Sequence, residues 1–177
     1  MIHRSAPCPS LHFAVSRRLR PLLAAFLLLP MLCNAEVFNA RVTSVADGDT
    51  LWVQPANGGK ARKLRLLGLD APEICQPGGA ASRTALQTLV ANKTVRIELK
   101  YYDDYGRGLA RIRVGTHDVG AQLVRAGQAW SYRWRQSPGP YATEEAAARR
   151  GKLGLFAHAA PELPRDFRKR HGRCYSR

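Results

Sequence analysis

The sequence predicts an α+β fold: a small five-stranded β-barrel with three helices. Short stretches rich in apolar and β-branched residues recur five times between residues 37 and 114. Turn-forming Gly, Asn and Asp residues separate most of these stretches. A helical pattern of apolar residues lies between the third and the fourth stretch. The 177 residues, 45% of them hydrophobic, are enough for one domain with a core, plus tails.

The strands are expected at residues 37–45, 50–53, 63–69, 94–99 and 109–114. Turns at residues 47–49 and 57–59 join the first three strands as hairpins, and a turn at residues 103–106 joins the last two. Pro72 ends the third strand because proline has no amide donor.

The helices are expected at residues 80–90, 119–126 and 142–150. In the last of them, Glu144 and Glu145 come early and Arg149 and Arg150 come late, which suits the helix dipole. The tail after Pro161 is basic and is expected to be loosely ordered. Five hairpin-linked strands with a helix between the third and the fourth are typical of the OB-fold, whose surface commonly binds oligonucleotides.

The first 35 residues are interpreted as an export signal. Three arginines at residues 17–20 precede a twelve-residue apolar run at residues 21–32, and Cys33-Asn34-Ala35 resembles a cleavage site. An uncleaved anchor and a lipoprotein at Cys33 are the alternatives, but the run is short for a membrane span and residues 30–32 match a lipobox poorly. We therefore expect a leader at 1–35, a domain at 36–160 and a basic tail at 161–177, without stable membrane association after cleavage.

The net charge of +15 favours a polyanionic partner: nucleic acid, an anionic membrane or another polyanion. From Arg125 onward there are 12 Arg or Lys residues and 4 acidic residues. Beyond the leader, the cysteines are Cys75 and Cys174. An oxidising compartment permits a disulfide between them, but the sequence leaves open whether they pair or stay unpaired.

Acidic residues cluster at two expected turns. Asp47 and Asp49 share the first turn, while Asp70 and Glu73 flank Ala71-Pro72 at the end of the third strand. Carboxylate and backbone carbonyl oxygens are ligands of hard cations such as calcium. Asp49, Asp70 and the Ala71 carbonyl could supply such a set.

Two arginines, Arg65 and Arg107, are further candidates for this site. Strict alternation puts Arg65 and Asp70 on opposite faces of one strand, so a shared site needs a bend, for which Gly68 is a plausible position. Arg107 stands between two glycines in the last turn, and this leaves its guanidinium unobstructed. Taken singly, Arg65 is better explained as a strand residue that faces solvent, and Arg107 could be an ordinary turn arginine on a basic surface.

Three segments together resemble the staphylococcal nuclease family: DGDT at residues 47–50, RLLGLDAPE at 65–73 and DDYGRGLA at 103–110. The resemblance extends from Val37 to Phe156. It implies an OB-fold with one bound Ca²⁺, which Asp49, Asp70 and the Ala71 carbonyl would hold, with Asp47 as a nearby carboxylate. Glu73 would be the general base, and Arg65 and Arg107 would bind phosphate.

The same resemblance implies a nuclease that acts on DNA and RNA, favours single strands and leaves 3′-phosphate ends. The leader predicts export, the lack of a base-reading motif predicts little sequence specificity, and we expect a monomer. Tyr105, Tyr132 and Trp134 could stack on unpaired bases. The main alternative is an OB-fold module that binds nucleic acid without cutting it. A secreted cationic protein that acts on membranes is another, but it leaves the clustered acids unexplained.

Overall fold

The computed structural model describes residues 36–172 and Cys174. The expected leader, residues 1–35, lies outside this range. Within the described part of the chain, no helix is long and apolar enough to cross a membrane.

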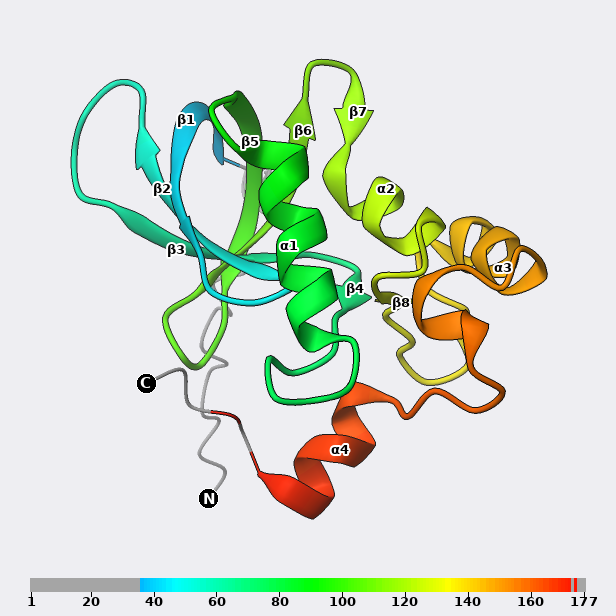
Figure 1. The fold of residues 1–177 in the computed structure, drawn as a ribbon. Coiled ribbons are helices and arrows are strands. Elements are labelled where there is room, and N and C mark those ends of the chain that lie inside the picture. Colours follow the sequence, from blue (N-terminus) through cyan, green and yellow to red (C-terminus); the bar gives the residue numbers. More distant parts are fainter. Residues whose placement is uncertain (1–35, 173, 175–177) are drawn as a thin grey trace, which may run out of the picture. The chain divides into compact units, whose positions relative to one another are not determined.

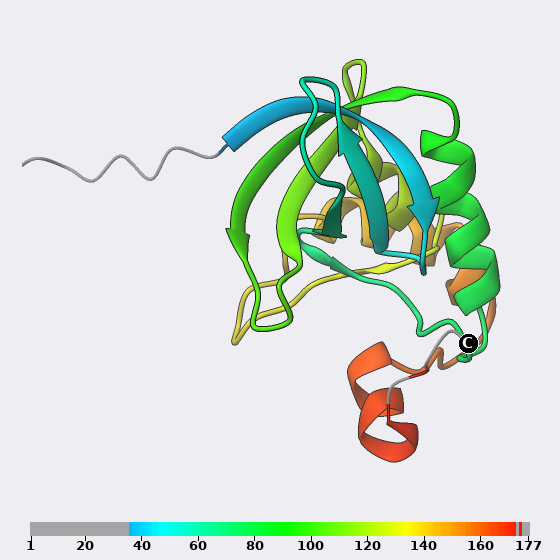
Figure 2. The same ribbon diagram turned by 90° about the vertical axis from the view of Figure 1, so that its left-hand side faces the viewer.

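Five strands close into a barrel (Figure 1): β1 (Glu36–Val45), β2 (Thr50–Pro55), β3 (Arg62–Leu66), β5 (Thr94–Tyr102) and β6 (Gly108–Val114). Antiparallel pairing joins them in the order β3-β2-β1-β5-β6, and a parallel pairing of β3 with β6 closes the ring. Figure 2 shows the strongly curved strands from the side. The predicted five-stranded α+β barrel is confirmed.

Alternation along the strands fills the barrel. In β5, Val95, Ile97 and Leu99 point inward, while the residues between them face outward or are partly covered. Leu51 and Val53 of β2 are fully buried in the same core. The core is therefore a continuous set of aliphatic side chains that holds the strand ends, and the residues on them, in place.

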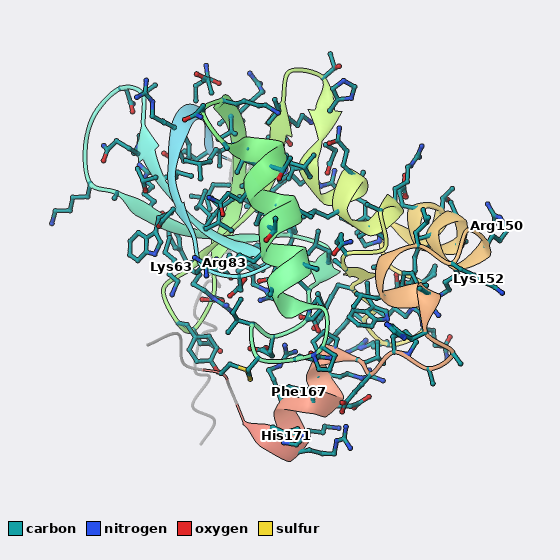
Figure 3. All side chains as sticks on the ribbon, viewed as in Figure 1. Lys63, Arg83, Arg150, Lys152, Phe167 and His171 are labelled. Atoms are coloured by element: carbon teal, nitrogen blue, oxygen red, sulfur yellow. A yellow bond between two sulfur atoms is a disulfide. The ribbon has the colours of Figure 1, made fainter. Side chains whose placement is uncertain are left out.

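The three predicted helices are present as α1 (Gly79–Val90), α2 (Val119–Arg125) and α3 (Ala142–Arg150). Helix α1 buries Leu86 and Val90. Its Arg83 also donates a 3.0 Å hydrogen bond to the carbonyl of Val45 at the end of β1 (Figure 3). This contact ties the helix to the strand that leads into the turn at residues 46–49.

The third strand is shorter than predicted. Strand β3 ends at Leu66, and the chain turns through Gly68, whose φ is +87°, into the two-residue strand β4 (Leu69–Asp70). Left-handed φ values favour glycine, and a side chain here would also collide with Pro140. Strand β4 pairs with β8 (Trp130–Ser131), and a further short strand, β7 (His117–Asp118), pairs with β6.

The expectation of a loosely ordered tail is wrong for residues 164–171, which form a helix. A 3-10 turn, η1 (Gly154–Ala157), is followed by helix α4 (Pro164–His171), which lies apart from α1–α3 in Figure 1. Pro164 occupies the first turn of α4 and four basic residues fill its last turn, so both ends follow helix preferences. Phe167 is buried and its ring lies 4.7 Å from that of His171 (Figure 3).

Candidate active site

A cleft of about 990 Å³ opens on one side of the barrel. Most of the residues predicted for the site line this cleft: Asp47, Asp49, Arg65, Asp70, Ala71, Glu73, Arg107, Tyr132 and Trp134. They come from five separate parts of the chain. The fold therefore brings together in space what the sequence shows only as scattered motifs.

Strand pairing places Asp49 beside Arg65. Thr50 of β2 lies opposite Arg65 of β3, and the Leu66 amide donates a 2.8 Å hydrogen bond to the Asp49 carbonyl. The Arg65 guanidinium then reaches Asp49 Oδ1 at 2.8 Å and Asp70 Oδ1 at 2.7 Å. The turn through Gly68 brings Asp70 to the same face as Arg65. This is the bend that the sequence predicted for a shared site.

Both carboxylates around Arg65 are buried, with Asp49 3% and Asp70 7% exposed. Burial alone would lower the pKa of Arg65, but the charges of Asp49 and Asp70 outweigh it and raise that pKa. Asp49 Oδ1 also accepts a hydrogen bond from Thr50, and its Oδ2 accepts one from the Ala71 amide. Arg65 is thus a fixed, permanently charged group in the wall of the cleft.

Asp47 adds a further negative charge at the first turn. Its Oδ1 accepts a 3.0 Å hydrogen bond from the Asp49 amide. Burial, followed by the nearby charge of Asp49, raises the pKa of Asp47 to about 7. This end of the cleft therefore holds carboxylates that repel one another, a situation that a bound cation would relieve.

The donors at this end suit a hard divalent cation: carboxylates of Asp47, Asp49 and Asp70, and the carbonyl of Ala71. In the structure, guanidinium groups hold oxygens of Asp49 and Asp70. Among the described residues, no three Asp, Glu, His or Cys side chains are grouped as metal ligands. The residue types fit the predicted Ca²⁺, and arginine charge balances the acids here.

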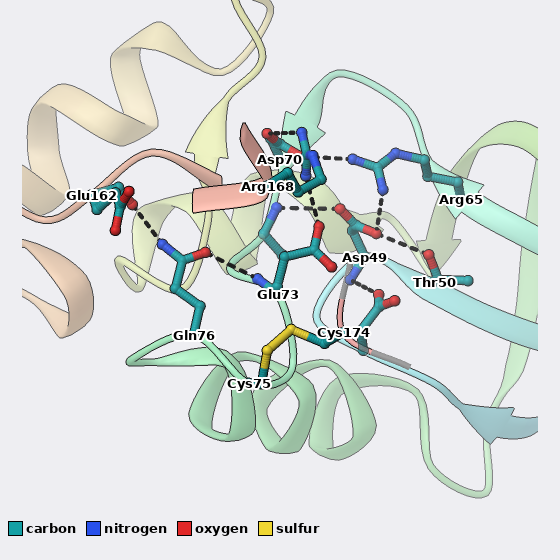
Figure 4. Close-up of polar contacts among 12 residues, drawn as sticks. Asp49, Thr50, Arg65, Asp70, Glu73, Cys75, Gln76, Glu162, Arg168 and Cys174 are labelled. Carbon is teal, nitrogen blue, oxygen red and sulfur yellow. Dashed lines mark hydrogen bonds and ion pairs between the residues drawn. A yellow bond between two sulfur atoms is a disulfide. The ribbon is translucent and has the colours of Figure 1, made fainter. Parts of the chain in front are cut away.

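Glu73 follows β4 by three residues. Its amide donates a 3.1 Å hydrogen bond to Gln76 Oε1, and its carboxylate Oε1 lies 2.8 Å from Arg168 Nη1. Arg168 belongs to α4, and its Nη2 also reaches Asp70 Oδ2 at 3.2 Å (Figure 4). Arg168 was not among the predicted site residues, because residues 161–177 were expected to form a tail outside the domain.

Arg107 lies on the turn between β5 and β6. The parallel pairing of Arg65 with Leu109 brings this turn to the cleft. Asp103 holds Arg107 in place: its Oδ2 lies 2.8 Å from Nε, and its Oδ1 accepts a hydrogen bond from the Arg107 amide. The role of Asp103 was also missed, although the four-residue spacing within a turn is a signal for such a contact.

The three predicted aromatic residues lie in two places, the cleft and the turn between β5 and β6. Tyr132 and Trp134 line the cleft and are 45% and 64% exposed. Pairing of β4 with β8, and a hydrogen bond from the Tyr132 amide to the Gly68 carbonyl, position their loop. Tyr105 is 63% exposed on the turn of Arg107, with its ring 5.5 Å from that guanidinium.

A buried acid anchors the loop that carries Tyr132. Glu145 of α3 is 2% exposed and accepts hydrogen bonds from the Ser131 amide, Arg133 and Arg149. From the sequence, Glu145 was expected only to interact favourably with the helix dipole at the start of the helix. Its position on an exposed-looking helix gave no signal that the carboxylate points inward to β8.

Cys75 and Cys174 form a disulfide, which decides between the two alternatives left open by the sequence. The bond joins the segment that follows Glu73 to the segment that follows α4 (Figure 4). Gln76 Nε2 adds a 2.7 Å hydrogen bond to the Glu162 carbonyl, just before α4. Helix α4, which lies between Glu162 and Cys174, is thus held next to the cleft.

The fold and the cleft together define a class of protein: a closed five-stranded barrel that holds buried carboxylates and arginines side by side in one open cleft. Residues 63–158 match the family described as staphylococcal nuclease homologues. The chain belongs to this family.

Relatives with nuclease names cover most of the chain. An uncharacterized endonuclease of Escherichia coli O157:H7 is 36% identical over 155 residues, which are 87% of this chain and 99% of that protein. An uncharacterized endonuclease of Haemophilus influenzae is 34% identical, over 77% of this chain and 76% of that protein. A micrococcal nuclease of Shigella flexneri is 30% identical, over 85% of this chain and 92% of that protein.

Proposed function

We propose that this protein is a Ca²⁺-dependent endonuclease that cleaves DNA or RNA without sequence specificity and leaves 3′-phosphate ends. The general part, hydrolysis of phosphodiester bonds by an endonuclease, follows from the family and from the nuclease names of its relatives. The observation that carries the rest is the cleft that Arg65, Glu73 and Arg107 line together with buried aspartates.

In the proposed reaction, Glu73 accepts a proton from the attacking water as the water oxygen bonds to phosphorus. The bond from phosphorus to the 5′ oxygen breaks, that oxygen takes a proton from solvent water to leave a 5′-hydroxyl, and Glu73 returns its proton to solvent. Arg65 and Arg107 donate hydrogen bonds to the phosphoryl oxygens, where negative charge increases. A planar guanidinium can make two parallel bonds to such a group.

Asp49, Asp70 and the Ala71 carbonyl would hold Ca²⁺, with Asp47 as a nearby carboxylate. The ion would supply Lewis-acid chemistry and orient the phosphate. The raised pKa of Asp47, caused by burial and by Asp49, supports a cation at this end of the cleft.

Substrate capture rests on charge and stacking. The leader holds four arginines and no acidic residue, so the processed chain keeps +11 of the net charge of +15, which favours binding that weakens as salt rises. Tyr132 and Trp134 in the cleft, and Tyr105 on the adjacent turn, offer exposed rings to unpaired bases. Stacking accepts every base, which agrees with a lack of sequence specificity.

Export and a monomeric state are part of the same proposal. The apolar run at residues 21–32 supports export. The disulfide supports an oxidising destination such as the periplasm or the medium. Detection of the processed chain in cell fractions, and light scattering of the purified protein, test these two statements.

The decisive experiment incubates the purified protein with single-stranded DNA, double-stranded DNA and RNA, each with Ca²⁺ and with a chelator. We expect cleavage with Ca²⁺, none with chelator, and phosphate at the 3′ ends of the products. Binding of all three nucleic acids without any cleavage would instead support the non-catalytic OB-fold module.

A further inference from the structure

We propose that Arg168 of α4 is a positioning residue for the reaction: it holds Glu73 at the angle needed to accept the proton of water. This inference rests on the proposed function. It adds to the site a third arginine, supplied by a segment beyond residues 63–158 that match the family.

The contacts of Arg168 point to this role. Nη1 lies 2.8 Å from Glu73 Oε1, and Nη2 lies 3.2 Å from Asp70 Oδ2, so one planar group spans both carboxylates. The Arg168 side chain is 27% exposed and lines the cleft. A carboxylate has two oxygens, so the arginine can fix one of them while the other receives a proton.

Glu73 needs such a partner because its own backbone does not lie in a regular element. It sits in the segment between β4 and α1, where Gln76 fixes its amide but not its carboxylate. A side chain with freely rotating torsions would spend much of its time away from the attacking water. Effective general bases are held within hydrogen-bond reach of the proton they take.

The position of Arg168 is itself enforced. The Cys75–Cys174 disulfide and the Gln76 contact to the Glu162 carbonyl fasten the two ends of α4 next to the segment of Glu73, and Phe167 of α4 is buried. An exposed ion pair on a free tail would contribute little to stability, because solvent screens the charges and both side chains must be ordered. A partly buried guanidinium on a tethered helix loses less conformational freedom on pairing than one on a free tail.

The test compares Arg168→Ala, Arg168→Lys and wild type in cleavage kinetics with Ca²⁺. We expect Arg168→Ala to lower kcat by roughly 10- to 100-fold, the range for residues that orient a functional ligand, with KM nearly unchanged. Arg168→Lys should recover part of the loss, and added guanidinium ion should partly restore Arg168→Ala. Arg62→Ala, which removes an equal charge from an ion pair with Glu36 outside the cleft, is the matched control and should cleave normally.

A second pair of variants tests the tether. Replacing Cys75 and Cys174 by serine should lower kcat less than Arg168→Ala does, and it should add nothing when combined with Arg168→Ala, because both act on the same contact. Thermal melts confirm that each variant is folded.

Several results would overturn the inference. Unchanged kcat in Arg168→Ala would do so, as would a rise in kcat, which would mean that Arg168 masks the site. A loss confined to KM would assign Arg168 to substrate binding instead. These outcomes leave the proposed function standing, whereas a wild-type protein that cleaves nothing removes the function and this inference together.

Discussion

At the scale of single residues, Glu73 and Arg107 occupy different surroundings in the same cleft. Glu73 is paired with an arginine from the end of the chain, whereas Arg107 is paired with an aspartate of its own turn. Each partner holds the side chain in place but does not take over its proposed role in the reaction. A substitution at either residue therefore tests a chemical role more than a structural one.

Glu73→Gln should reduce cleavage by about 10²- to 10⁴-fold, the contribution of a positioned general base. Glutamine keeps the size of the side chain and can still accept a hydrogen bond from Arg168, but it cannot accept a proton from water. Single-turnover cleavage with Ca²⁺ measures the loss, and a thermal melt serves as the control for folding. Normal turnover in this variant would refute the role of Glu73.

Arg107→Lys should reduce cleavage on the order of 10²- to 10³-fold, as expected for loss of a preorganised donor. Lysine keeps the charge and can still pair with Asp103, but it cannot make two parallel bonds to a phosphate. Steady-state kinetics on single-stranded DNA measure the effect. If the variant cleaves like wild type, charge alone suffices at this position.

At the scale of elements, the turn between β5 and β6 depends on Asp103. Its carboxylate accepts hydrogen bonds from the amides of Tyr105 and Arg107 and from the Arg107 side chain. Burial would raise the pKa of Asp103, but these hydrogen bonds outweigh it and lower that pKa below the ordinary value of 3.8. The ionised form therefore stabilises the folded turn.

Asp103→Asn should lower the free energy of unfolding at pH 7, and the difference from wild type should shrink as the pH falls. A carboxyl whose pKa is depressed in the folded state stabilises above its unfolded pKa, and this contribution is lost as the pH drops through the folded value. Urea denaturation at pH 7 and at about pH 2–3 measures the change. Asp104→Asn, at the exposed neighbouring position, is the control. If the difference in the free energy of unfolding between Asp103→Asn and wild type did not change with pH, the Asp103 carboxylate would not be its cause.

The elements also show how much the sequence could predict. Strands and the first three helices follow from local apolar periodicity and turn residues, and the bend at Gly68 follows from the need to bring Arg65 and Asp70 together. Helix α4 carries the same kinds of local signals in Pro164 and its basic last turn. Its contact with the cleft could not be predicted, because Arg168 meets Glu73 across 95 positions and several other tail arginines were equally plausible.

At the scale of the whole molecule, the disulfide links two segments that are 99 positions apart. Replacing both cysteines by alanine should lower the free energy of unfolding by roughly 2–5 kcal/mol, mainly because the unfolded chain regains freedom. Chemical denaturation of the oxidised wild type, the reduced wild type and the double variant measures the change. The reduced wild type and the variant should agree, and equal stability of all three would show that the bond constrains little.

The parallel pairing of β3 with β6 affects the order in which the parts of the molecule fold. Strand β3 carries Arg65, and strand β6 follows Arg107. The two strands are distant in the sequence and become neighbours when the barrel closes. Long-range pairings form late, since the entropy of closing a large loop must be offset first. A chain that has formed its hairpins but not the β3–β6 pairing therefore does not yet hold Arg65 and Arg107 in one cleft, and we expect cleavage activity to arise only with this last pairing.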